Sequence, residues 1–81
     1  MTAGFIIIVT DLFLTDNPFK GTFYNEYDAY DALINEYCIK LKQHSNEVIE
    51  ANIDLNEASF YIKDEKEQIL SKGVIEVIDI K

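Results

Sequence analysis

The sequence predicts an α+β fold in which one amphipathic helix packs on one face of a mostly antiparallel, single-layer sheet of four to five strands. Three patterns predict this fold: a β-branched apolar run near the start, a helical period of apolar residues at about 26–44, and alternating apolar and polar residues beyond it. No linker, repeat or low-complexity segment divides residues 1–81. We therefore expect one compact domain with the element order β-(β)-α-β-β-β.

The first expected element is a strand at about residues 5–14. Residues of both parities are apolar there except Thr10 and Asp11, and many are β-branched. This pattern is typical of a strand that is covered on both faces, so we expect it to be the central strand. Turn-forming residues at 15–21 predict a loop, and a short strand is expected at 22–24.

The helix is expected at about residues 26–44. Asn25 is a suitable N-cap, acidic residues occupy the first turns, and basic residues lie near the negative end of the helix dipole. At about 100° per residue, one third of the circumference is apolar and is expected to pack on the sheet. Ile39 lies outside this stripe and is expected to be exposed or to lie in an interface. The stripe consists of Tyr27, Tyr30, Ile34, Tyr37, Cys38 and Leu41, with Leu33 at its margin.

Antiparallel strands are expected after the helix, at about residues 48–55, 58–63 and 69–80, where the period becomes two. Residues 64–73 fit either a short helix or a hairpin turn. The hairpin is preferred, because a short isolated helix is marginally stable. One helix covers only one face of such a sheet. We therefore expect a second copy or a hydrophobic partner on the other face.

Composition argues against several classes of protein. The chain has 15 acidic and 7 basic side chains, a net charge of -8 and no Arg, so it lacks the positive footprint of direct nucleic-acid binding. Cys38 is the single cysteine and forms no internal disulfide, which favours a cytoplasmic protein. Residues 5–9 follow no basic residue and Asp11 interrupts them, so we expect a strand and no signal peptide. No apolar run approaches the ~20 residues of a membrane span.

The sequence predicts no catalytic, cofactor or metal site, and hence no enzyme. Cys38 and His44 are about 120° apart around the helix and about 9 Å apart along it, too far for a nucleophile and its base. Residues 54–57 resemble the start of a calcium loop but lack the later ligands. One His and one Cys do not build a structural zinc site. The three glycines are too dispersed for a phosphate-binding loop.

Four tyrosines and four carboxylates interleave at residues 22–37. Tyrosine provides a large amphipathic contact area at protein interfaces, and surrounding carboxylates steer the chain toward a basic partner. An interpretation of equal weight places three of these tyrosines in the core and leaves Tyr24 unexplained. The carboxylates have about the charge spacing of a DNA strand, but they point around most of the helix. Mimicry of a nucleic acid would need acids from other elements.

No motif identifies a family. In composition and size, the chain resembles the short, acidic, arginine-free proteins of phages and mobile elements of AT-rich bacteria. Many of these inhibit nucleases, restriction systems or CRISPR effectors. The resemblance implies a nucleic-acid mimic that docks on the basic surface of a nucleic-acid-handling protein. An alternative is a small structural subunit that forms a homodimer or larger homo-oligomer through its uncovered sheet face, with its charge serving solubility. The expected partner-binding residues are Tyr24, Glu26, Asp28, Asp31, Glu50, Asp54, Glu65 and Glu67.

Overall fold

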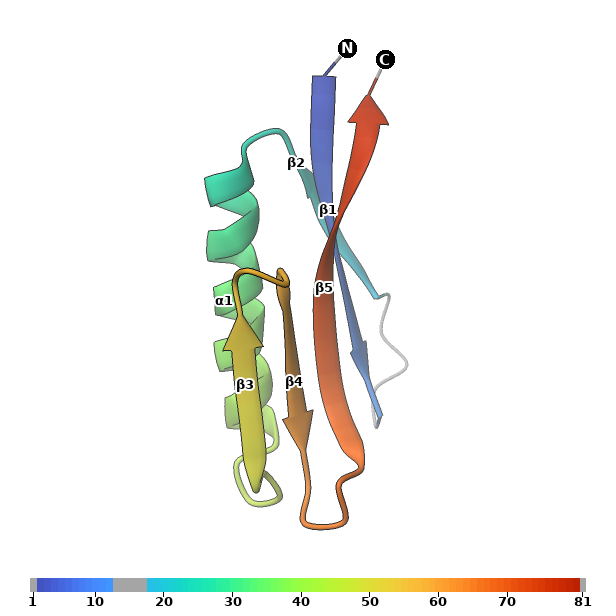
Figure 1. Ribbon diagram of the computed structural model, residues 1–81. Helices are drawn as coiled ribbons and strands as arrows, with labels where there is room; N and C mark the ends of the chain where they lie inside the picture. Colours follow the sequence, from blue (N-terminus) through green and yellow to red (C-terminus); the bar gives the residue numbers. More distant parts are fainter. Residues whose placement is uncertain (1, 13–17, 81) are drawn as a thin grey trace.

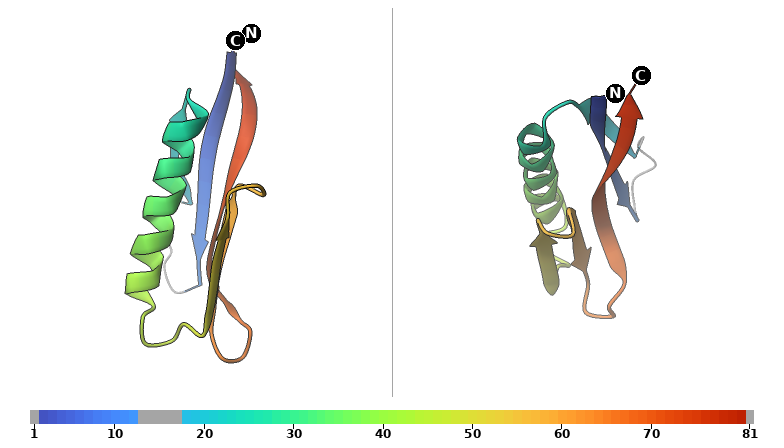
Figure 2. Two further views of the ribbon diagram at one scale, coloured as in Figure 1. Left: turned by 60° about the vertical axis from the view of Figure 1, so that its left-hand side comes forward. Right: turned by 45° about the horizontal axis from the view of Figure 1, so that its top comes forward.

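The computed structural model describes residues 2–12 and 18–80, which form five strands and one helix (Figure 1). All neighbouring strands are antiparallel, and the sheet order is β2-β1-β5-β4-β3. The helix lies on one face of the sheet (Figure 2), which is the predicted α+β fold. The elements are β1 (Thr2–Asp11), β2 (Phe19–Phe23), α1 (Glu26–Gln43), β3 (Glu50–Asp54), β4 (Ser59–Lys63) and β5 (Ile69–Ile80).

The two longest strands, β1 and β5, form the middle of the sheet. They pair over ten residue positions. β1 lies inside the sheet between β2 and β5, while the middle place in the strand order belongs to β5. The end of the first predicted strand and the start of the loop predicted at 15–21 lie outside the described residues. No helix in the described part of the chain combines the length and the apolar character that a membrane crossing requires.

A tight turn, and no short helix, connects β4 to β5. The Asp64 side chain accepts hydrogen bonds from the backbone N–H groups of Lys66 at 2.9 Å and Gln68 at 3.0 Å. The Asp64 N–H group donates to the carbonyl oxygen of Gln68 at 3.1 Å. Glu67 adopts a positive φ of 60°, a conformation typical of turns. Asp64 therefore closes the turn through its side chain and its backbone.

The hydrophobic core lies between α1 and the face of the sheet that α1 covers. The Phe60 ring lies over Gly73, its cross-strand partner, where a Cβ atom would come within 2.3 Å of the ring. The same ring contacts Tyr37 of α1 edge-on, with centroids 5.4 Å apart. Glycine at position 73 thus makes room for the ring that links the sheet to the helix. The buried cluster consists of Ile7, Val9, Leu33, Phe60, Ile62 and Leu70.

The buried side of α1 is centred about one residue position away from the stripe that the sequence predicts. Leu33, expected at the margin, is fully buried, as is Ala29 one turn earlier. Tyr37 and Leu41 pack against the core, as predicted. The last turns also bury Lys40. The predicted stripe was drawn from apolar residues alone and left this lysine out. The predicted stripe is therefore displaced from the side of the helix that is buried.

Three residues of the predicted stripe point to solvent instead. Tyr27 is 77% exposed, Ile34 is 38% exposed and Cys38 is exposed, so their predicted burial is wrong. Tyr30 is half-buried. Ile39 is exposed, as predicted. The helix therefore presents aromatic and apolar side chains on the side that faces away from the sheet.

Candidate functional site

A strip of exposed residues runs along the side of α1 that faces away from the sheet. At about 100° per residue, its members fall within about 60° of one another around the helix. We call it the outer strip. Tyr24, in the connection between β2 and α1, is 69% exposed. The outer strip consists of Tyr27, Asp31, Ile34 and Cys38, all of them exposed.

The helix cap fixes the start of the outer strip. The Asn25 side chain accepts a hydrogen bond from the backbone N–H group of Tyr27 at 2.8 Å, as the sequence predicts. Glu26 and Asp28 lie in the first turn, where their charge interacts favourably with the helix dipole. The Tyr30 hydroxyl donates to the Glu26 carboxylate at 2.7 Å. This hydrogen bond raises the pKa of Tyr30 and gives the Glu26 carboxylate a partner on its own helix.

Two of the predicted site residues on α1 carry carboxylates with no partner in the described part of the chain. Asp28 and Asp31 are exposed. Among the described residues, neither side chain forms a hydrogen bond or an ion pair. Their directions differ by about 60° around the helix. These two carboxylates are therefore available to an external partner beside the exposed ring of Tyr27.

Glu50 and Asp54, at the two ends of β3, make contacts within the chain. The Glu50 carboxylate lies 3.8 Å from the ammonium group of Lys63. A hydrogen bond to Glu50 also raises the pKa of Tyr61. The Asp54 side chain accepts two backbone hydrogen bonds, at 2.9 and 3.3 Å, from the turn that follows β3. Both carboxylates therefore contribute to the local structure of the sheet.

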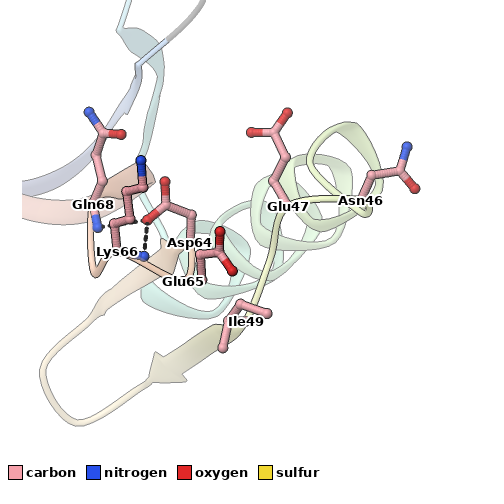
Figure 3. Close-up of a pocket in the computed structure, with 7 residues that line it drawn as sticks. All are labelled: Asn46, Glu47, Ile49, Asp64, Glu65, Lys66 and Gln68. Atoms are coloured by element: carbon pink, nitrogen blue, oxygen red, sulfur yellow. Dashed lines mark hydrogen bonds between the residues drawn. The ribbon is translucent and has the colours of Figure 1, made fainter.

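Glu65 and Glu67 lie in the turn between β4 and β5. A shallow pocket of about 380 Å³ separates this turn from the connection between α1 and β3, and Figure 3 shows residues of the two segments on either side of it. Glu65 lines the pocket and Glu67 does not. No group of three or more His, Cys, Asp or Glu in the described ranges is arranged to hold a metal ion. The pocket is lined by Asn46, Glu47, Ile49, Asp64, Glu65, Lys66 and Gln68.

The structure does not gather the eight predicted residues on one surface. Figure 1 shows the start of α1 at the end of the molecule near the chain termini, and the turn between β4 and β5 at the opposite end. The helix between them is about 27 Å long at 1.5 Å per residue. One group contains Tyr24, Glu26, Asp28 and Asp31, the other contains Glu50, Glu65 and Glu67, and Asp54 lies at the end of β3.

The sequence interpretation missed a buried ionic cluster beneath the end of α1. The Oδ2 atom of Asp11 lies 2.7 Å from Nε2 of His44 and 3.9 Å from Nζ of Lys40. The three side chains are only 4 to 7% exposed, and Nζ of Lys40 also donates to Oε1 of Gln43 at 3.3 Å. Two signals were present: an acid that interrupts an apolar strand, and two basic residues four positions apart on a helix. The cluster joins β1 to α1.

The face of the sheet opposite α1 is a second candidate surface. Ile8 and Val74 lie opposite each other on β1 and β5, on the side that the helix does not cover, and both are partly exposed. A shallow pocket of about 420 Å³ opens over them. We call this surface the open face.

Comparison of the chain with protein-family models, with curated proteins and with solved structures gave no match.

Proposed function

We propose that this chain is a non-enzymatic binding protein that docks the outer strip of α1 on a basic surface of a nucleic-acid-handling protein, such as a nuclease or a defence effector. The observation that carries the proposal is the exposure of Tyr24 and Tyr27, at 69% and 77%, beside the unpaired carboxylates of Asp28 and Asp31. The resemblance of the chain in size and composition to acidic inhibitors of phages and mobile elements supports the same function.

The two tyrosines supply the contact area. Neither Tyr24 nor Tyr27 is needed by the core, because both are mostly exposed in the folded chain. Tyrosine is enriched among the residues that dominate binding energy at protein interfaces, since its ring is large and loses little conformational freedom on binding. Ile34, about two turns further along the same strip than Tyr27, extends the apolar area. Together these side chains form the proposed contact centre.

The carboxylates supply the preference for a basic partner. With a net charge of -8, the chain is attracted over a distance to surfaces rich in Lys and Arg. Such surfaces are the ones that bind phosphate backbones. Asp28 and Asp31 lie where the tyrosines make contact, so they select a positive surface at short range. Glu50, Glu65 and Glu67, near the other end of the helix, are proposed as secondary contacts of a partner long enough to reach them.

The test is affinity capture from a lysate of the source cells, with elution in steps of rising salt and identification by mass spectrometry. We expect a nucleic-acid-binding protein to be retained at low salt, displaced by added DNA or RNA, and lost with the double variant Asp28→Lys, Asp31→Lys. The variant Glu65→Lys, Glu67→Lys makes the same change of charge at the other end of the molecule and is expected to retain most of the binding. Equal loss in both variants would contradict a localised site, as would full retention by the first.

A further inference from the structure

We propose that the open face of the sheet binds the same face of a second copy of this chain. This surface lies on the other side of the sheet from α1, so the proposal goes beyond the docking function and is tested independently of it. The open face is formed by alternate residues of each strand. Its apolar members on β1, β4 and β5 are Ile6, Ile8, Tyr61, Val74 and Ile78, all of them half-buried.

The register of the strands places a row of residues across the middle of the open face, with the apolar Ile8 and Val74 side by side and the polar Ser59 and Asp54 beyond them. Val74 of β5 lies between Ile8 of β1 and Ser59 of β4. Within residues 2–12 and 18–80, no element covers this row (Figure 2). A strand that is apolar on both sides, as β1 is, normally has cover on both sides. The row is therefore the natural centre of an interface.

Two charged residues flank Val74 on the same strand and the same face. Lys72 precedes it by two positions and Glu76 follows it by two, so each lies about 7 Å from it along β5. Both side chains are exposed, and in the described part of the chain neither forms an ion pair. The order along the strand is positive, apolar, negative. Reversing the strand gives negative, apolar, positive, so the order is complementary to itself in charge.

A two-fold axis over Val74, perpendicular to β5 and lying between the two sheets, pairs these charges twice. The rotation reverses β5, so Lys72 of each copy faces Glu76 of the other while the apolar residues of the two rows meet at the centre. Packed sheets lie about 10 Å apart and cross at about 30°. At about 7 Å from the axis, this angle displaces the two side chains sideways by about 4 Å. Lysine and glutamate side chains are long enough to bridge that separation.

The charge distribution favours a second copy over a basic partner on this face. Two chains of charge -8 repel each other in most orientations. On the open face, in contrast, Lys63 already lies 3.8 Å from Glu50, and Lys72 balances Glu76. Two copies therefore meet there with Lys72 and Glu76 facing their opposites, while Asp54, on the row of Val74 but two strands away from it, faces its own copy. A basic partner would place its positive groups against the two lysines.

The open face also has about the area that a stable dimer requires. At about 3.3 Å per residue along a strand and about 4.8 Å between strands, the five strands cover a flat area of roughly 600 Å². Protruding side chains raise the accessible area above this value. Stable interfaces bury about 800 Å² per partner. The two areas are of the same order.

Light scattering during size exclusion, over a hundredfold range of concentration in reducing buffer, tests the proposal. We expect a mass of twice 9.3 kDa. Val74→Lys is expected to give the single chain. The matched control Val77→Lys adds the same charge to the opposite face of the same strand, where Val77 is 66% exposed, and is expected to leave the dimer intact. A mass of 9.3 kDa at all concentrations overturns the proposal, as does a dimer that persists in Val74→Lys.

Charge exchange tests the geometry with substitutions of exposed residues that do not disturb the core. Lys72→Glu alone and Glu76→Lys alone each oppose like charges, and each is expected to raise the dimer Kd at least tenfold. The double variant restores opposite charges and is expected to return the Kd to within about threefold of the original value. Circular dichroism confirms the fold of each variant. A folded double variant that dimerises no better than the single variants overturns the two-fold arrangement.

Discussion

The two faces of the sheet are formed by the same strands but differ in their cover. On the face beneath α1, Ile7, Val9 and Phe60 are at most 3% exposed. On the open face, Ile8 and Val74 remain partly exposed. Ile8 lies in β1 between Ile7 and Val9, and Val74 is its partner on β5. β1 supplies apolar residues to both faces, whereas the described residues supply one helix. A strand that is apolar on both sides normally has cover on both, and this difference between the faces is the basis of the proposed dimer.

Charged residues differ between the two faces as well. The covered face places Asp11 against His44 and Lys40 in a site that water barely reaches. The open face keeps Glu50 and Lys63 at its exposed margin, 3.8 Å apart. A buried group that loses its partner keeps the full cost of desolvation, while an exposed group returns to water. The same substitution should therefore have very different effects on the two faces.

The largest expected effect is the loss of Asp11. Asp11→Ala leaves Lys40 and His44 buried without their carboxylate, and is expected to lower the free energy of unfolding by about 3 to 5 kcal/mol. Glu50→Ala breaks the exposed pair with Lys63 and is expected to cost about 0 to 1 kcal/mol. Urea unfolding followed by circular dichroism measures both. Similar losses for the two variants would contradict the difference between the faces.

Neighbouring residues on α1 give the second test. Leu33→Ala removes a fully buried side chain from the covered face and is expected to cost about 2 to 5 kcal/mol. Ile34→Ala changes a residue that is 38% exposed on the outer strip, and is expected to cost less than about 1 kcal/mol. The comparison of their urea midpoints reports the rotation of the helix directly. A larger loss of stability for Ile34→Ala than for Leu33→Ala would contradict this orientation of the helix and favour the one predicted from the sequence.

The smallest expected effect is on stability at alkaline pH. Burial raises the pKa of Tyr37 above its ordinary value of 10.0. Above pH 10 the unfolded chain loses this proton before the folded chain does, so the free energy of unfolding falls as the pH rises. Tyr37→Phe is expected to make this decline shallower. Urea midpoints at several values between pH 9 and about 11 measure it, and identical slopes in the two proteins would exclude the contribution of Tyr37.

Local signals in the sequence were sufficient for most of the elements. Asn25 was identified as the helix cap from its residue type, and its side chain makes the expected bond to the N–H group of Tyr27. The preference for a hairpin over a helix at 64–73 followed from the instability of short helices, and Asp64 closes the turn with hydrogen bonds of its side chain and its backbone. Such features depend on residues a few positions apart, which the sequence shows directly.

The orientation of the helix and the placement of the candidate site depend on tertiary contacts. Periodicity counts Lys40 and His44 as surface residues, but Asp11, 33 positions before His44, draws both into the interior. In the same orientation of the helix, Leu33 lies inward and Tyr27 outward. The sequence therefore named Tyr24 and the acids as candidate site residues, but it placed Tyr27 in the core, whereas Tyr27 is 77% exposed beside them. The separation of the acids into two groups likewise follows from the strand order.

The exposure of Cys38 has a consequence for redox chemistry. A thiol on the surface of α1 is open to air oxidation, so two chains can become linked through their helices in solution without reductant. Such a covalent pair would have the mass of a dimer but would be joined on the side opposite the open face. The same thiol is a natural attachment point for a spin label or a fluorophore. A label there would report contact at the outer strip without any engineered cysteine.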